Sequence, residues 1–153
     1  MRIVKYSIHL DSDKKGILVK EESKNCPEYN TLNSPKKICD VFNQVFHASQ
    51  RAEEYVWLMA LDVKCKPIGF FEISHGTVNS SLITPREVFV RLCLCSAASF
   101  VLVHNHPSGD PLPSKEDMEV TKRMKETGKM MGISLLDHII IGAEGFYSFT
   151  SNR

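Results

Sequence analysis

The chain alternates between short, strongly apolar runs and longer segments in which apolar residues recur with helical spacing. Residues 55–61 (YVWLMAL) and 99–103 (SFVLV) are apolar almost without a break, which is typical of strands buried on both faces of a sheet. A turn at Pro67 predicts a hairpin between the first of these strands and the run that follows it. The strands expected in this part of the chain are 55–61, 68–73, 99–103, 135–141 and 146–149.

Three segments combine a helix start signal with an amphipathic pattern. Ser34-Pro35 provides an N-cap residue and a proline at the first helical position, and apolar residues follow at i, i+3, i+4, i+7 and i+8. Residues 84–87 (TPRE) have the form of a capping box and predict a helix of about three turns. Residues 114–117 (SKED) also form a cap and predict a long helix that Gly132 ends. Helices that alternate with apolar strands predict an α/β fold, in which helices cover the faces of a central sheet.

The N-terminal part of the chain carries weaker patterns. Residues 1–10 contain scattered apolar positions and predict a strand. Residues 11–33 are polar and are interrupted by Gly16 and Pro27, so we expect a loop-rich segment with one short strand at residues 16–20.

Length and composition indicate one soluble globular domain of 153 residues, of which 42% are hydrophobic and 24% charged. The formal net charge is +1, which disfavours nucleic acid as a partner, because domains that bind it usually carry a basic excess. The first residues lack the features of a signal peptide, and no apolar run approaches the ~20 residues that span a bilayer. The five cysteines form no CxxC motif and are expected to be reduced, so we expect a cytoplasmic protein without a membrane segment.

Two histidines stand at the carboxyl end of a predicted strand. His104 and His106 are two residues apart, so in an extended chain both side chains point the same way. Asp117 lies on the first turn of the next predicted helix, and the Pro/Gly-rich loop between them can return that turn to the strand end. Two imidazoles and one carboxylate leave a fourth position on Zn²⁺ for water, which is the composition of a catalytic zinc site. Such a site also needs a general base.

The same residues resemble a known motif. His104-x-His106-Pro107 followed by Ser114-x-x-Asp117 is similar to the JAMM motif of the JAB/MPN metalloproteases. The longer strings GTVNSSLITPREVF, VHNHPSGDPLPSKED and LLDHIIIG are similar to the RadC-like branch of that superfamily, and the resemblance covers roughly residues 34–150. It implies a three-layer, cytidine-deaminase-like mixed sheet flanked by helices, with residues 34–153 as the RadC-like domain and residues 1–33 as an N-terminal strand and loop extension.

The resemblance also implies roles for individual residues. His104, His106 and Asp117 would bind Zn²⁺, and the Ser114 hydroxyl would help to hold the oxyanion. A glutamate upstream would act as the acid and base. Among the candidates the pattern favours Glu54, a carboxylate directly before a buried apolar strand, over three others: Glu53, Glu72 and Glu87.

Two further positions have open interpretations. Asp137 and His138 either form a hydrogen-bonded pair at a strand entrance or support a zinc-ligating histidine, because such imidazoles usually donate their other N–H to an acceptor. Asn105 points to the opposite side of the strand from the histidines, and we expect it to anchor a loop by hydrogen bonds.

The function expected from these features is that of a zinc-dependent metallopeptidase or isopeptidase that acts on a protein or peptide. A metal-dependent nuclease is the first alternative, because the letters HNH at residues 104–106 occur as a nuclease motif. A DNA-repair-associated or scaffold module that retains zinc is the second alternative. A zinc deaminase is excluded, because the chain has neither the HxE nor the PCxxC signature.

Overall fold

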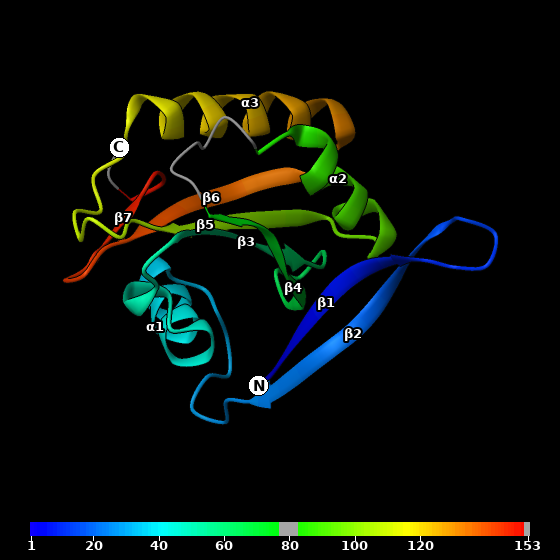
Figure 1. Ribbon diagram of the computed structural model, residues 1–153, viewed down its shortest axis with the longest axis horizontal. Helices are drawn as coiled ribbons and strands as arrows, with labels where there is room; N and C mark the ends of the chain where they lie inside the picture. Colours follow the sequence, from blue (N-terminus) through cyan, green and yellow to red (C-terminus); the bar gives the residue numbers. More distant parts are fainter. Residues whose placement is uncertain (77–82, 152–153) are drawn as a thin grey trace.

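The computed structural model describes residues 1–76 and 83–151, and this part of the chain contains seven strands and three α-helices. Residues 77–82, within one of the strings that resemble the RadC-like branch, lie outside the described residues. The elements in chain order are β1 (Arg2–Leu10), β2 (Gly16–Asn25), α1 (Pro35–Phe46), the 3-10 turn η1 (Ala48–Gln50), β3 (Glu54–Leu61), β4 (Pro67–Gly76), α2 (Pro85–Leu94), β5 (Ser99–Asn105), α3 (Lys115–Met131), β6 (Ser134–Ile141) and β7 (Phe146–Ser148) (Figure 1).

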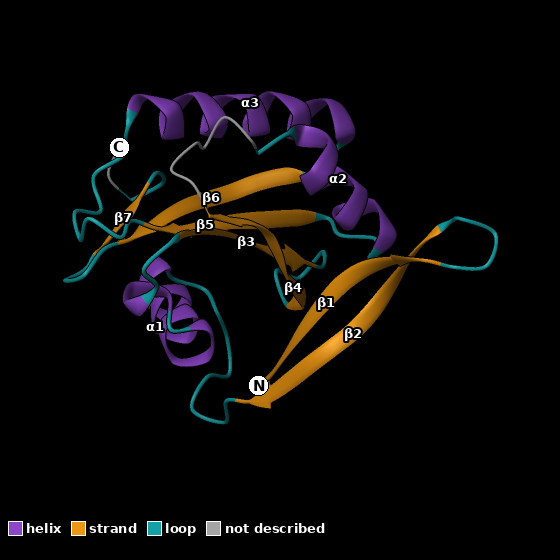
Figure 2. Ribbon diagram, in the orientation of Figure 1, coloured by secondary structure: helices purple, strands orange, loops and turns teal. Residues whose placement is uncertain are grey.

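All seven strands form one mixed sheet in the order β2-β1-β4-β3-β5-β6-β7. The β1–β4 and β5–β6 pairs are parallel, and the other neighbouring pairs are antiparallel. Helix α1 covers one face of the sheet, whereas α2 and α3 cover the other (Figure 2). The predicted three-layer α/β architecture is therefore confirmed.

Alternating side chains of the central strands supply two separate cores. On β3, Trp57 and Met59 pack against α1, whereas Leu58 and Ala60 face α2 and α3. Strand β5 alternates in the same way, and both strands are buried along nearly their whole length. This double burial explains why both strands lack polar alternation in the sequence.

Local capping determines where the helices begin. Ser34 accepts a hydrogen bond from the Lys37 N–H at the start of α1, and Thr84 accepts one from the Glu87 N–H at the start of α2. Helix α3 begins with a capping box and ends at Gly132, which has the left-handed φ of 69° that suits glycine. No helix in the described ranges combines the length and the apolar character that crossing a membrane requires.

The prediction for residues 11–33 is wrong in one respect. The expected short strand at residues 16–20 is the ten-residue strand β2, which forms an antiparallel hairpin with β1. Strand β2 is an edge strand with exposed side chains along most of its length, so its sequence lacks the apolar alternation that marks a half-buried strand. Its pairing with β1 supplies the order that its side chains do not.

Candidate metal centre

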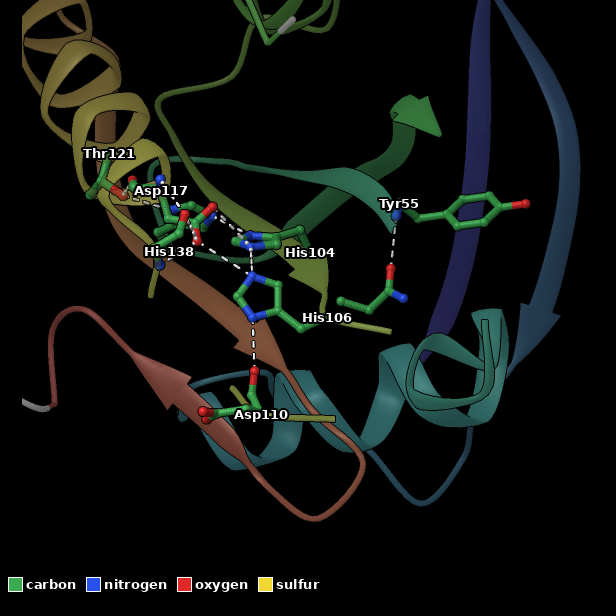
Figure 3. A network of polar contacts seen from close by, with 9 residues as sticks. Tyr55, His104, His106, Asp110, Asp117, Thr121 and His138 are labelled. Atoms are coloured by element: carbon green, nitrogen blue, oxygen red, sulfur yellow. Dashed lines mark hydrogen bonds and ion pairs between the residues drawn. The ribbon is translucent and has the colours of Figure 1, made fainter. Parts of the chain in front are cut away.

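Four side chains that are distant in the sequence converge at one end of the sheet. Glu54, His104, His106 and Asp117 each offer a possible metal-ligating atom, and these atoms all lie within 4.8 Å of one another. They come from the start of β3, from the end of β5 and its following residue, and from the first turn of α3. Figure 3 shows His104, His106 and Asp117 pointing toward one another at this position.

Side-chain alternation places these groups on the same face of the sheet. Leu58 of β3 and Leu102 of β5 face α2 and α3, so Glu54 and His104, at even-numbered spacing from them, belong to that face too. Antiparallel pairing sets Val56 opposite His104. Glu54 therefore lies two residues before Val56 on β3, on the same face of the sheet as His104.

The loop after β5 is tied to the neighbouring strand. The His106 N–H donates to the Ile141 carbonyl at 2.9 Å, and the Ala143 N–H donates to the Gly109 carbonyl at 2.9 Å. The α3 capping box then fixes Asp117, whose Oδ2 accepts hydrogen bonds from the Ser114 N–H at 2.8 Å and the Ser114 hydroxyl at 2.6 Å. A local helix-start motif thus also orients a carboxylate toward the histidines.

The distances between the possible ligands suit a small tetrahedral ion. His104 Nε2 lies 3.2 Å from Asp117 Oδ1, His106 Nε2 lies 3.4 Å from Asp117 Oδ2, and the two Nε2 atoms are 3.0 Å apart. A tetrahedral Zn²⁺ ion with ligands at about 2.0–2.1 Å has neighbouring ligand atoms about 3.3–3.4 Å apart. The three side chains therefore fit zinc in both chemistry and spacing.

Both histidines use Nδ1 for a hydrogen bond outside the cluster, so that Nε2 of each ring points toward the other possible ligands. His106 Nδ1 lies 2.8 Å from the Asp110 carbonyl, which can only accept, so Nδ1 carries the hydrogen. His104 Nδ1 lies 2.8 Å from His138 Nε2. The two Nε2 atoms lie 3.0 Å apart, a separation that either a shared proton or a bound cation stabilises.

A series of hydrogen-bonded side chains behind His104 determines which of its ring nitrogens carries the hydrogen. The Thr121 hydroxyl donates to the Asp117 carbonyl at 2.6 Å, so its oxygen accepts from His138 Nδ1–H, also at 2.6 Å. His138 Nε2 is then an acceptor for His104 Nδ1–H, which leaves His104 Nε2 free for a metal. This chain of three groups is drawn in Figure 3.

Sequence reasoning missed Thr121, although a signal for it exists. Thr121 lies four residues after Asp117 on α3, at the spacing at which a hydroxyl reaches back to a helical carbonyl. Asp137, in contrast, faces away from the histidine cluster and binds the His138 N–H, the Ser148 hydroxyl and the Thr150 N–H. Of the pair at residues 137–138, only His138 contacts a possible metal ligand in the described residues.

The electrostatics of the centre keep a carboxylate next to the imidazoles. Burial alone would raise the pKa of Asp117, but hydrogen bonds with His104 and His106 hold this pKa well below its usual range. The hydrogen bond to Asp117 raises the pKa of His106 despite its burial. Full burial, and then the charge of His104, lower the pKa of His138 well below its usual value, so His138 is neutral. A metal that binds here competes with protons for His106, so its affinity is expected to fall as the pH is lowered.

A cleft of about 380 Å³ opens beside this cluster, and Glu54, His106, Ser114 and Asp117 all line it. The Ser114 hydroxyl donates to Asp117 Oδ2 at 2.6 Å. Glu53 and Glu116 also line the cleft. Four of the five residues that the sequence assigns to metal binding or catalysis therefore line the cleft, and His104 is the one that does not.

The other candidate glutamates occupy different places. Glu72 pairs with Lys5 and His75, and Glu87 pairs with Arg86 and Arg91 on α2. Glu53 is exposed at the rim of the cleft. In the described residues, Glu54 is thus the glutamate whose carboxylate joins the two histidines and Asp117.

Loss of the Thr121 hydroxyl is expected to weaken metal binding without removing a ligand. In Thr121→Val the hydrogen bond to His138 is lost, so His104 is no longer held in one tautomer and orientation. The expected result is a roughly 10–100-fold lower metal affinity, measured by competition with a chromophoric chelator. Thr127→Val is the matched control, because Thr127 makes the same backward bond on α3, to Arg123, at an exposed position. Equal affinities of the two variants would contradict this role.

Comparisons with known proteins agree in their family assignment. A family described as the RadC-like JAB domain matches residues 32–153. A UPF0758 protein of Pelobacter propionicus is 45% identical over 118 residues, which cover 77% of this chain and 51% of the relative. A UPF0758 protein of Clostridium perfringens is 54% identical over 96 residues, which cover 63% of this chain and 42% of the relative. The chain spans about half the length of the curated relatives it matches.

Proposed function

The chain belongs to the RadC-like JAB domain family, and from this premise we propose that it is a zinc-dependent metallopeptidase or isopeptidase. The observation that carries the proposal is the convergence of Glu54 with His104, His106 and Asp117 within 4.8 Å, at the wall of an open cleft. A carboxylate beside a two-histidine, one-carboxylate site is the arrangement that metal-assisted hydrolysis needs.

His104, His106 and Asp117 are the residues that would hold the ion. When bound there, zinc would lower the pKa of a coordinated water to near 7 and polarise a substrate carbonyl. Glu54 would accept the proton that the attacking water loses and pass it to the leaving amine. The Ser114 hydroxyl, which donates to Asp117 in this structure, would turn toward the carbonyl oxygen as negative charge develops there.

The lining of the cleft favours an amide substrate over a polyanion. Glu53, Glu54, Glu116 and Asp117 line it, and neither lysine nor arginine does among the described residues. Carboxylates at this position repel phosphodiesters. Asn105 is also unavailable to a nuclease metal, because its amide binds the backbone at Glu53 and Tyr55. We therefore propose a protein or peptide substrate, and the five free cysteines support a cytoplasmic location.

The direct test is hydrolysis of a peptide library and of ε-linked lysine isopeptides by the purified protein. We expect cleavage that a zinc chelator abolishes and that added Zn²⁺ restores. A plasmid-nicking assay under the same conditions is expected to show no strand breaks. Nicking of the plasmid, with both amide libraries intact at full zinc occupancy, would overturn the proposal.

A further inference from the structure

Asn105, the residue between the two histidines, is buried and reaches the strand that carries Glu54. Asn105 is 1% exposed to solvent. Its Oδ1 accepts a hydrogen bond from the Tyr55 N–H at 2.8 Å, and its Nδ2 donates to the Glu53 carbonyl at 3.0 Å. Figure 3 labels Tyr55 and draws the first of these bonds as a dashed line from its backbone nitrogen. The amide therefore binds the backbone on both sides of Glu54.

This contact continues the β5 side of β3 beyond the last backbone pair of these two strands, whereas on the other side β3 stays paired with β4 as far as Glu54, opposite Gly76. The antiparallel register of β3 and β5 pairs Val56 with His104 and extends no further toward the start of β3. Beyond that point, the Asn105 side chain offers an acceptor and a donor in the arrangement of a peptide group. The Tyr55 N–H and the Glu53 carbonyl thus bind the Asn105 amide at the place where backbone groups of β5 would bind them if the pairing of the two strands continued.

Asn105 acts from the opposite face of the sheet. Val103 of β5 belongs to the core under α1, so Asn105 lies on that face, whereas His104 and Glu54 lie on the α3 face. The amide cannot reach the metal or the cleft in this arrangement. Its hydrogen bonds act on the backbone that carries the Glu54 side chain, and zinc affinity distinguishes this route from an effect on its neighbours His104 and His106.

We propose that Asn105 is a positioning residue that holds Glu54 over the metal centre. Two consecutive residues of β5 then have separate tasks, because His104 binds the metal while Asn105 fixes the distance between the metal and the general base. The proposal rests on the proposed function of Glu54. General bases are sensitive to position, and a displacement of about 1 Å can lower the rate by about 100-fold.

The first test is a kinetic comparison of zinc-loaded proteins. In Asn105→Ala we expect kcat to fall by about 100-fold, with zinc affinity unchanged and KM within about twofold of the parent value. In a Glu54→Gln background the same substitution is expected to cause no further loss, because the base it positions is already gone. Asn43→Ala is the matched control, since Asn43 also accepts a backbone N–H, from Ser49, but lies on α1 outside the cleft.

Asn105→Asp serves as a second variant of nearly the same size, in case the alanine variant does not fold. It keeps an acceptor for the Tyr55 N–H but loses the donor to the Glu53 carbonyl, and a lower kcat at unchanged zinc affinity is expected again. Independent losses in the Asn105→Ala/Glu54→Gln double variant, or a parallel loss of zinc affinity, would overturn the positioning role.

Crystal structures of the zinc-loaded parent and Asn105→Ala test the inference without activity. We expect the Glu54 carboxylate to leave the cluster formed with His104, His106 and Asp117 in the variant only. An unmoved Glu54 overturns the inference even if the parent is an active peptidase. A displaced Glu54 in a protein that hydrolyses no amide supports the positioning contact, and in that case it is the proposed function that fails.

Discussion

Substitution of His106 by alanine is expected to abolish zinc binding and all measurable amide hydrolysis. The substitution removes one Nε2 ligand and leaves only His104 and Asp117, so the loss of affinity should exceed the roughly 10–100-fold caused by loss of an outer hydrogen-bond partner. His106 suits this test better than His104, because its side chain is 15% exposed whereas that of His104 is 2% exposed. Removal of His106 therefore leaves a smaller cavity.

Zinc content by mass spectrometry and the melting temperature with and without zinc measure the effect. An ion that binds only the folded state raises the melting temperature, and this increase is expected in the parent and absent from His106→Ala. The control is His75→Ala, since His75 is an exposed histidine that pairs with Glu72 outside the cluster. A His106→Ala protein that still contains one equivalent of zinc would rule out the assigned ligand set.

Substitution of Glu54 by glutamine is expected to leave zinc in place and to lower kcat by roughly 10²–10⁴-fold. The side chain keeps its size, but an amide cannot accept the proton of the attacking water. The geometry allows Glu54 to act as a general base or as a metal ligand, because its carboxylate lies within 4.8 Å of the other three groups. Measuring zinc affinity separates these two roles. Retained zinc with lost turnover identifies the general base.

Glu53→Gln provides the comparison for this variant. Glu53 lines the same cleft and is exposed, but it does not belong to the metal cluster. Its substitution is expected to change kcat by less than about twofold. If Glu54→Gln turns over peptides as fast as Glu53→Gln, Glu54 is not the base; if it loses zinc as His106→Ala does, Glu54 is a ligand.

Local sequence signals predicted most of the helices and strands, because capping and burial on both faces depend on residues that are close together in the sequence. Helix starts depend on a hydroxyl that reaches a backbone N–H three residues later, and Ser34, Thr84 and Ser114 all make this bond. Strands β3 and β5 are buried on both faces, so their apolar runs were visible without any knowledge of their partners. Strand β2 was underestimated because exposed edge strands depend on pairing rather than on their own pattern.

By itself the sequence determined those site features that lie within a single segment of the chain. The i, i+2 spacing of His104 and His106 at a strand end and the cap that holds Asp117 are local features. Their meeting with Glu54, the clamp by Asn105 across 50 positions, and the support of His104 by His138 across 34 positions depend on the tertiary structure. These contacts follow from the register of β5 against β3 and β6, which is determined by the burial of both sheet faces together and by no single segment.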